Sequence, residues 1–188
     1  MYQLPSIEEF RKSSPEEQKE VIDHLFEPCD SLNWFIQSFV IHQRFETYTQ
    51  FINLVRSELE ILVNRNGFFA VRNGYEANNL INDIISAHPR LGAQPKATTQ
   101  LSQHSAEEQK KLGGEAMQKK LAELNERYES TFPGLRYVVF VNGRSRDEII
   151  VNMEERIKRN DIELEKKEAF DAMCDIALDR AAKLGVKL

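Results

Sequence analysis

Apolar residues recur at intervals of three and four along most of this chain. A clear example is the run Leu32, Phe35, Ile36, Phe39 and Val40, whose spacing places the side chains on one face of an α-helix. The same pattern predicts helices over about 7–12, 15–26, 32–40, 45–63, 75–88, 105–128, 146–159 and 163–184. We therefore expect an all-α fold, a compact bundle of about eight helices that forms one domain over residues 1–188.

Several of these helices begin with a capping box, in which a Ser and a Glu three residues later satisfy each other's backbone N–H groups. The boxes that begin at Ser6, Ser14 and Ser145 mark three helix starts. The 105–128 helix begins with a fourth, Ser105-x-x-Glu108. Two adjacent glycines, Gly113-Gly114, predict that this helix is weakened or bent inside its span.

Two stretches break the helical pattern. Residues 89–104 contain two prolines and few apolar residues, and a connection of this length is commonly functional or disordered. Tyr137-Val138-Val139-Phe140-Val141 resembles a strand and is closed by Asn142-Gly143. Because no partner strand is evident, we interpret 137–141 as a buried extended segment.

Composition excludes several classes of protein. The chain has a formal net charge of -5 and no concentrated basic stripe, so we expect no nucleic-acid partner. No apolar run is long enough to span a membrane, and the first residues lack a signal-peptide core. Cys29 and Cys174 lie far apart in the sequence, which favours reduced thiols of an intracellular protein.

Metal and nucleotide sites also lack their usual signals. His104 and Glu108 are four residues apart, but a metal site needs three or four ligands. His24 and His42 lie in other predicted helices without ligand spacing. We expect no metal, and the chain contains no phosphate-binding loop, dinucleotide-binding glycine motif or hydrolase nucleophile elbow.

His88 is the first candidate for chemistry. The residue before a proline is disfavoured in α geometry, so His88 is expected at a helix end, with its imidazole projecting into a loop. A non-catalytic alternative is that His88 complements the helix dipole. Ser105, Glu108 and Gln109 allow two interpretations as well: an ordinary helix cap, or a helix N-terminus that binds an anion or a carbonyl oxygen.

The order of several motifs resembles one enzyme family, 2-oxo-4-hydroxy-4-carboxy-5-ureidoimidazoline (OHCU) decarboxylase, in a fungal-type form. The resemblance covers nearly the whole chain. The motifs are Leu25-Phe26-Glu27-Pro28-Cys29, His88-Pro89-Arg90-Leu91-Gly92, Ser105-x-x-Glu108-Gln109, Leu124-Asn125-x-x-Tyr128, Phe132-Pro133, Tyr137 to Arg144 and Ile176-Ala177-x-x-Arg180.

The resemblance implies a mainly helical, cofactor-free enzyme that forms a homodimer. It makes His88 the catalytic histidine and Glu108 its acidic partner. Substrate contacts are implied for Pro89, Ser105, Gln109, backbone groups of Tyr137, Val138, Val139, Phe140 and Val141, and Arg180. Without the resemblance, Arg180 is one cation among 25 Lys and Arg. Arg90 departs from the aspartate that often follows the His-Pro pair, and residues 92–102 also match less closely.

The implied reaction is the conversion of OHCU to (S)-allantoin, the last step of urate degradation. The substrate's own C=N group can accept the electron pair that CO₂ leaves behind, so the reaction needs no cofactor as electron sink. Two alternatives stay open: a helical ligand-binding or adaptor protein of the same fold, and a lyase or isomerase that acts on a related ureide.

The C-terminal residues leave the compartment open. Val186-Lys187-Leu188 shares its last two residues with the peroxisomal Ser-Lys-Leu signal, although valine is a poor substitute for serine. An ordinary polar tail is the alternative. We expect residence in the peroxisome or the cytoplasm.

Overall fold

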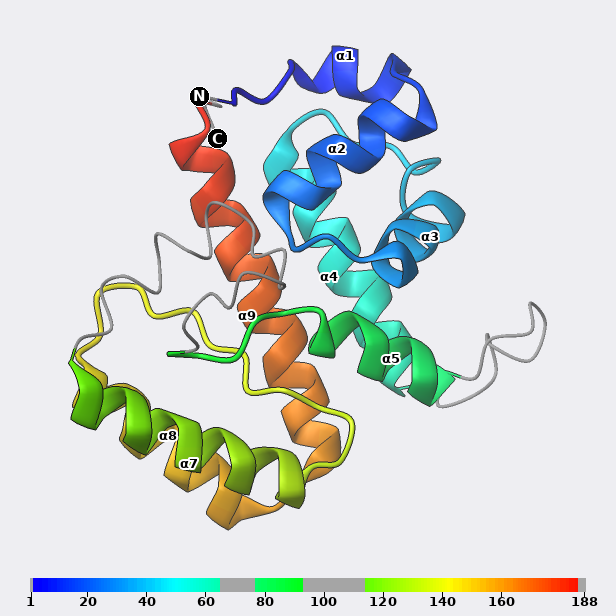
Figure 1. Cartoon of the computed structure of the whole chain (residues 1–188). Helices are drawn as coiled ribbons and strands as arrows, with labels where there is room; N and C mark the ends of the chain where they lie inside the picture. The colour runs from blue at the N-terminus through cyan, green and yellow to red at the C-terminus, as the bar shows by residue number, and fades with distance from the viewer. Residues whose placement is uncertain (1, 65–76, 93–113, 186–188) are drawn as a thin grey trace.

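The computed structural model describes residues 2–64, 77–92 and 114–185. These ranges contain eight helices and no strand, which confirms the all-α prediction (Figure 1). The helices are α1 (Ile7–Lys12), α2 (Pro15–Leu25), α3 (Asp30–Phe39), α4 (Tyr48–Asn64), α5 (Ala77–Ser86), α7 (Glu115–Thr131), α8 (Arg146–Arg159) and α9 (Ile162–Lys183).

The helix starts follow local capping chemistry. The capping boxes at Ser6, Ser14 and Ser145 are formed, with each Ser hydroxyl accepting from the N–H of the Glu three residues later. The predicted box at Ser105 lies outside the described residues. Gly114 is extended and is the N-cap of α7, so the prediction that one helix continues through Gly114 is wrong. Glycine favours a helix end over a helix interior because it loses more backbone entropy in the helix.

The 22-residue helix α9 organises the core. It packs most extensively against α4 and also contacts α2 and α5, while α7 packs against α8 (Figure 1). Phe170, Met173, Cys174 and Ala177 of α9 are buried in one continuous hydrophobic core. None of the described helices combines the length and the apolarity that crossing a membrane requires.

A tight turn at Gly134 sets the course of the chain after α7. Gly134 has φ +87°, and a Cβ placed on it would lie 2.5 Å from the amide nitrogen of Asn82 on α5. Only glycine fits both the backbone conformation and the space. The turn therefore brings the start of the stretch 135–145, yellow in Figure 1, against α5, and Arg136 reaches the carbonyl of His88 beyond the end of that helix.

Candidate active site

A cavity of about 400 Å³ opens where three parts of the chain meet. The first part follows the end of α5, the second is the stretch between α7 and α8, and the third is the C-terminal part of α9. The described lining residues are His88, Pro89, Leu91, Tyr137 to Arg144, Arg146, Ile176, Asp179, Arg180 and Lys183.

His88 lies two residues beyond the end of α5, as the following proline predicts. The backbone N–H of His88 donates to the carbonyl of Ile85 at 3.3 Å. The guanidinium of Arg136 donates to the backbone carbonyl of His88 at 2.9 Å. The imidazole is not displayed on an exposed loop, because His88 is only 5% exposed and forms part of the cavity wall. Among the described residues, its Nε2 has no hydrogen-bond partner.

The surroundings of His88 favour a neutral imidazole. Burial lowers its pKa from 6.5 to about 4, and the nearby cations Arg180 and Arg136 act in the same direction, while Glu27 opposes them. A neutral ring can accept a proton at neutral pH. It cannot complement a helix dipole as a cation, which argues against the non-catalytic interpretation.

Arg180 enters the cavity from α9 and is almost completely buried. One of its terminal nitrogens lies 2.8 Å from Oε1 of Glu27, and the other donates to the carbonyl of Phe26. Phe26 and Glu27 belong to the turn after α2, where Pro28 prevents the helix from continuing. The turn thus fixes the guanidinium, and Glu27 balances its charge out of water.

Cationic side chains outnumber carboxylates around the cavity although the whole chain is acidic, and two of these cations, Arg180 and Lys183, pair with Glu27 and Asp179. Arg144, Arg146, Arg180 and Lys183 line the cavity, while Asp179 is the one acidic residue among the described lining residues. The chain carries a formal net charge of -5. Cations gathered in a cleft of a negative protein attract an anionic ligand.

The extended stretch forms one wall. Tyr137 and Val138 are buried, and Val139, Phe140 and Val141 are half-buried. The Tyr137 hydroxyl donates to Oδ1 of Asn152 on α8 at 2.6 Å. The sequence interpretation of 137–141 as a buried extended segment agrees with the structure in that the stretch belongs to no helix and no strand, but only Tyr137 and Val138 of it are buried.

The structure thus brings most of the predicted site residues together. His88, Pro89, Tyr137 to Val141 and Arg180 come from three distant parts of the sequence and line one cavity. Ser105, Glu108 and Gln109 lie outside the described residues. Arg90 points to α7, where its guanidinium pairs with Glu129 at 2.5 Å, and it is not among the described lining residues.

Sequence reasoning missed the residues that hold the site in place. Glu27 forms an ion pair with Arg180, and Arg136 donates to the backbone carbonyl of His88. Neither residue stands in a local sequence pattern that distinguishes it from a charged residue at the surface. The available signals were that Glu27 precedes a proline, which ends a helix, and that it stands within the first motif of the resemblance, which gave it no role. Among the described residues, no cluster of His, Cys, Asp and Glu could hold a metal ion.

A concave pocket with a few convergent polar side chains and a histidine of lowered pKa is the expected form of a ligand-binding or active site. The family model for OHCU decarboxylase matches residues 11–182. The chain belongs to the OHCU decarboxylase family, a family of carboxy-lyases.

Comparison with solved structures supports the fold. A crystal structure of (S)-allantoin synthase is similar, with a TM-score of 0.56 and 14% sequence identity. The match covers 96% of this chain and 54% of that one, so this chain spans about half the length of that protein. Comparison with curated proteins gives no match.

Proposed function

We propose that this protein converts OHCU to (S)-allantoin without a cofactor, the last step of urate degradation. The observation that carries the proposal is the cavity in which His88, the extended stretch and Arg180 meet. Family membership makes decarboxylation the expected chemistry of that cavity.

The charge of the cavity suits this substrate. OHCU carries a carboxylate, and Arg144 and Arg146 line the cavity in addition to Arg180, which pairs with Glu27, and Lys183, which pairs with Asp179. Arg180 is the buried cation, and its planar fork can bind a carboxylate or a ring carbonyl through paired hydrogen bonds. Because Glu27 and Phe26 already hold the guanidinium, little entropy is lost when the substrate binds.

Because the substrate's own C=N group accepts the electron pair, the protein has mainly to transfer protons. Loss of CO₂ breaks the bond between the ring carbon and the carboxylate, and the electron pair moves into the adjoining C=N group, whose nitrogen takes up a proton. The ring gains a second proton at the new stereocentre and loses the hydroxyl proton as the carbonyl forms. A neutral His88 can accept the hydroxyl proton, and we assign Glu108 as its acid–base partner.

The direct test supplies urate, uricase and hydroxyisourate hydrolase, and follows circular dichroism. Accelerated appearance of optically active allantoin supports the proposal. Binding of the intermediate without accelerated turnover contradicts it, and would identify a ligand-binding protein of the same fold.

Two variants test the acid–base assignment. Glu108→Gln removes an ionisable group but remains acceptable in a capping box. We expect turnover to fall by on the order of 10²-fold in Glu108→Gln and in His88→Asn, with nearly unchanged melting temperatures. The double variant should lose much less than the product of the two losses. Near-normal turnover in either single variant contradicts the pairing, and equal losses of stability and activity in Glu108→Gln favour a helix cap.

Assembly and compartment remain predictions. We propose a homodimer, which light scattering after gel filtration tests directly. Residues 186–188 lie outside the described residues, and a fluorescent fusion at the N-terminus tests whether they act as a peroxisomal signal. A diffuse cytosolic signal contradicts peroxisomal residence.

A further inference from the structure

The wall formed by residues 137–141 has no backbone partner strand within the described residues. Buried backbone carbonyls need hydrogen-bond donors, and a segment without a partner strand obtains them from side chains or from water. Two arginines supply them. Arg144 donates to the carbonyls of Phe140 and Val141, and Arg156 of α8 donates to the carbonyl of Val138 at 3.0 Å.

Arg156 holds this wall without itself being among the described residues that line the cavity. Its Nη1 reaches Val138, and its guanidinium lies over the ring of Tyr137, 4.7 Å from the ring centroid. A cation over an aromatic face is attracted to it. Arg156 is 4% exposed and is not among the described lining residues of the cavity.

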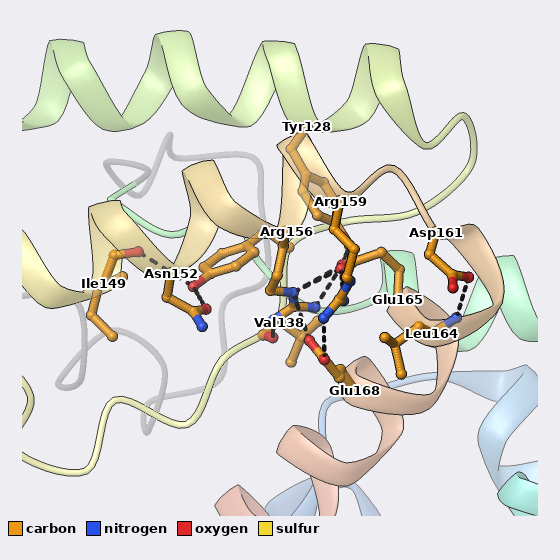
Figure 2. Close-up of polar contacts among 11 residues, drawn as sticks. Tyr128, Val138, Ile149, Asn152, Arg156, Arg159, Asp161, Leu164, Glu165 and Glu168 are labelled. Carbon is orange, nitrogen blue, oxygen red and sulfur yellow. Dashed lines mark hydrogen bonds and ion pairs between the residues drawn. The ribbon is translucent and has the colours of Figure 1, made fainter.

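Arg156 is itself held firmly (Figure 2). Its Nε lies 2.9 Å from Oε2 of Glu165, which is completely buried at the start of α9. The Tyr128 hydroxyl donates to the same oxygen at 2.5 Å, and Arg159 binds the other oxygen at 2.7 Å. The hydrogen bonds fix the carboxylate and so fix the guanidinium that reaches Val138.

We propose that Arg156, anchored by Glu165, is a positioning residue of the active site. It sets the place of the Tyr137–Val141 wall, and thereby of the groups that face the substrate. The inference rests on the proposed function, because the wall positions a substrate only if the cavity binds one. Ion pairing with Glu165 and Glu168 would not by itself require the contact to Val138, which is why that contact indicates a positioning role.

The test compares Arg156→Lys with Arg56→Lys. Lysine preserves the charge next to Glu165 but cannot also reach the Val138 carbonyl with a planar fork. Arg56 bridges α4 to Asp171 and Asp175 of α9 through partly exposed ion pairs and is not among the described lining residues of the cavity, so it controls for loss of an arginine ion pair between two helices. Each variant is assayed at the same interval below its own melting temperature.

We expect kcat/KM to fall about tenfold to hundredfold in Arg156→Lys, since small displacements of positioning groups have effects of this size. Arg56→Lys should stay within about twofold of the wild type. Glu165→Gln acts on the wall only through Arg156 and its other neighbours, so its kcat/KM should fall to a similar extent. It serves as the test variant if Arg156→Lys does not fold. Wild-type kinetics in a folded Arg156→Lys protein, or equal losses in Arg56→Lys, overturn the inference.

Failure of the proposed function has a different signature. If the wild type does not accelerate OHCU turnover, that function fails, and backbone NMR order parameters decide the inference about the wall. Lower order parameters for residues 138–141 in Arg156→Lys than in Arg56→Lys support the inference, and equal values overturn it.

Discussion

Two buried arginine–glutamate pairs lie at opposite ends of α9 and have different surroundings. Arg180 and Glu27 border the cavity, and among the described contacts the guanidinium is held by one turn. Arg156 and Glu165 are enclosed among Tyr128, Arg159 and a backbone carbonyl. Both pairs are removed from water, yet only Arg180 is in a position to meet a ligand.

The comparison shows what a buried ion pair contributes. The attraction within such a pair often only offsets the free energy of removing both charges from water. The Arg180–Glu27 pair beside the cavity is therefore expected to add little net stability, which fits a role in ligand binding. Arg156 also binds the backbone carbonyl of Val138, so the Arg156–Glu165 pair fixes the position of the stretch 137–141.

The largest expected effect comes from replacing the pair at the cavity. Arg180→Met leaves Glu27 buried without its cation and should lower the free energy of unfolding by about 3–5 kcal/mol. Adding Glu27→Leu should recover at least half of that loss, because no lone charge remains. Turnover should stay reduced by on the order of 10²-fold or more in both proteins, since the proposed bidentate contact with the substrate can no longer form.

Urea denaturation and the allantoin assay separate these two effects. The comparison is Arg156→Met alone and combined with Glu165→Met. Here we expect the double variant to recover little of the unfolding free energy that Arg156→Met loses, because Tyr128, Arg159 and the Val138 carbonyl lose their partners. If the two double variants recover the same share of the lost unfolding free energy, the two pairs do not differ in what they contribute to stability.

The next effect concerns pH, because only the pair at the cavity adjoins a buried histidine. The pKa of His88 is lowered to about 4, below the unfolded value of 6.5, so the unfolded chain binds more protons between these values. The contribution to stability is present above about pH 6.5 and is lost as pH falls toward 4. It amounts to roughly 3 kcal/mol.

Chemical denaturation across pH 4 to 7 measures this contribution. His88→Asn should flatten the dependence, whereas His42→Asn, a change at an exposed histidine, should leave the wild-type slope. An unchanged slope in His88→Asn would show that other groups cause the acid sensitivity.

The smallest effect is expected at a third arginine–glutamate pair, which is partly exposed. Arg90 and Glu129 have side chains 42% and 26% exposed, and such pairs contribute about 0–1 kcal/mol. Because Arg90 points to α7, Arg90→Gln should leave kcat/KM within about twofold of the wild type. A larger change in kcat/KM would place Arg90 in the electrostatics of the cavity.

The contrast also explains how far the sequence could be interpreted. Helix starts at Ser6, Ser14 and Ser145 follow from residues three positions apart, so local chemistry was enough to predict them. His88 was marked by the proline that follows it. The roles of Glu27 and Glu165 depend on partners brought close only by folding, and a charged residue in a helical pattern is usually solvated.

Arg180 illustrates the same limit. Its position near the end of α9 gives no local sign of burial, and only the motif order singled it out. The extended stretch was recognisable from its β-branched and aromatic residues. Its hydrogen-bond donors, by contrast, could not be assigned, because they come from Arg144 within the connection to α8 and from Arg156 on that helix.

The sequence separations within the two pairs have a consequence for the order of folding. Arg156 and Glu165 are nine residues apart, joined by a turn in which Asn160 adopts φ 53°. Arg180 and Glu27 are 153 residues apart. Contacts between distant residues carry a larger loop-closure entropy and tend to form later. We therefore expect the α8–α9 corner to assemble early and the cavity to be completed last, so that catalytic activity would appear only once the two ends of the chain have met.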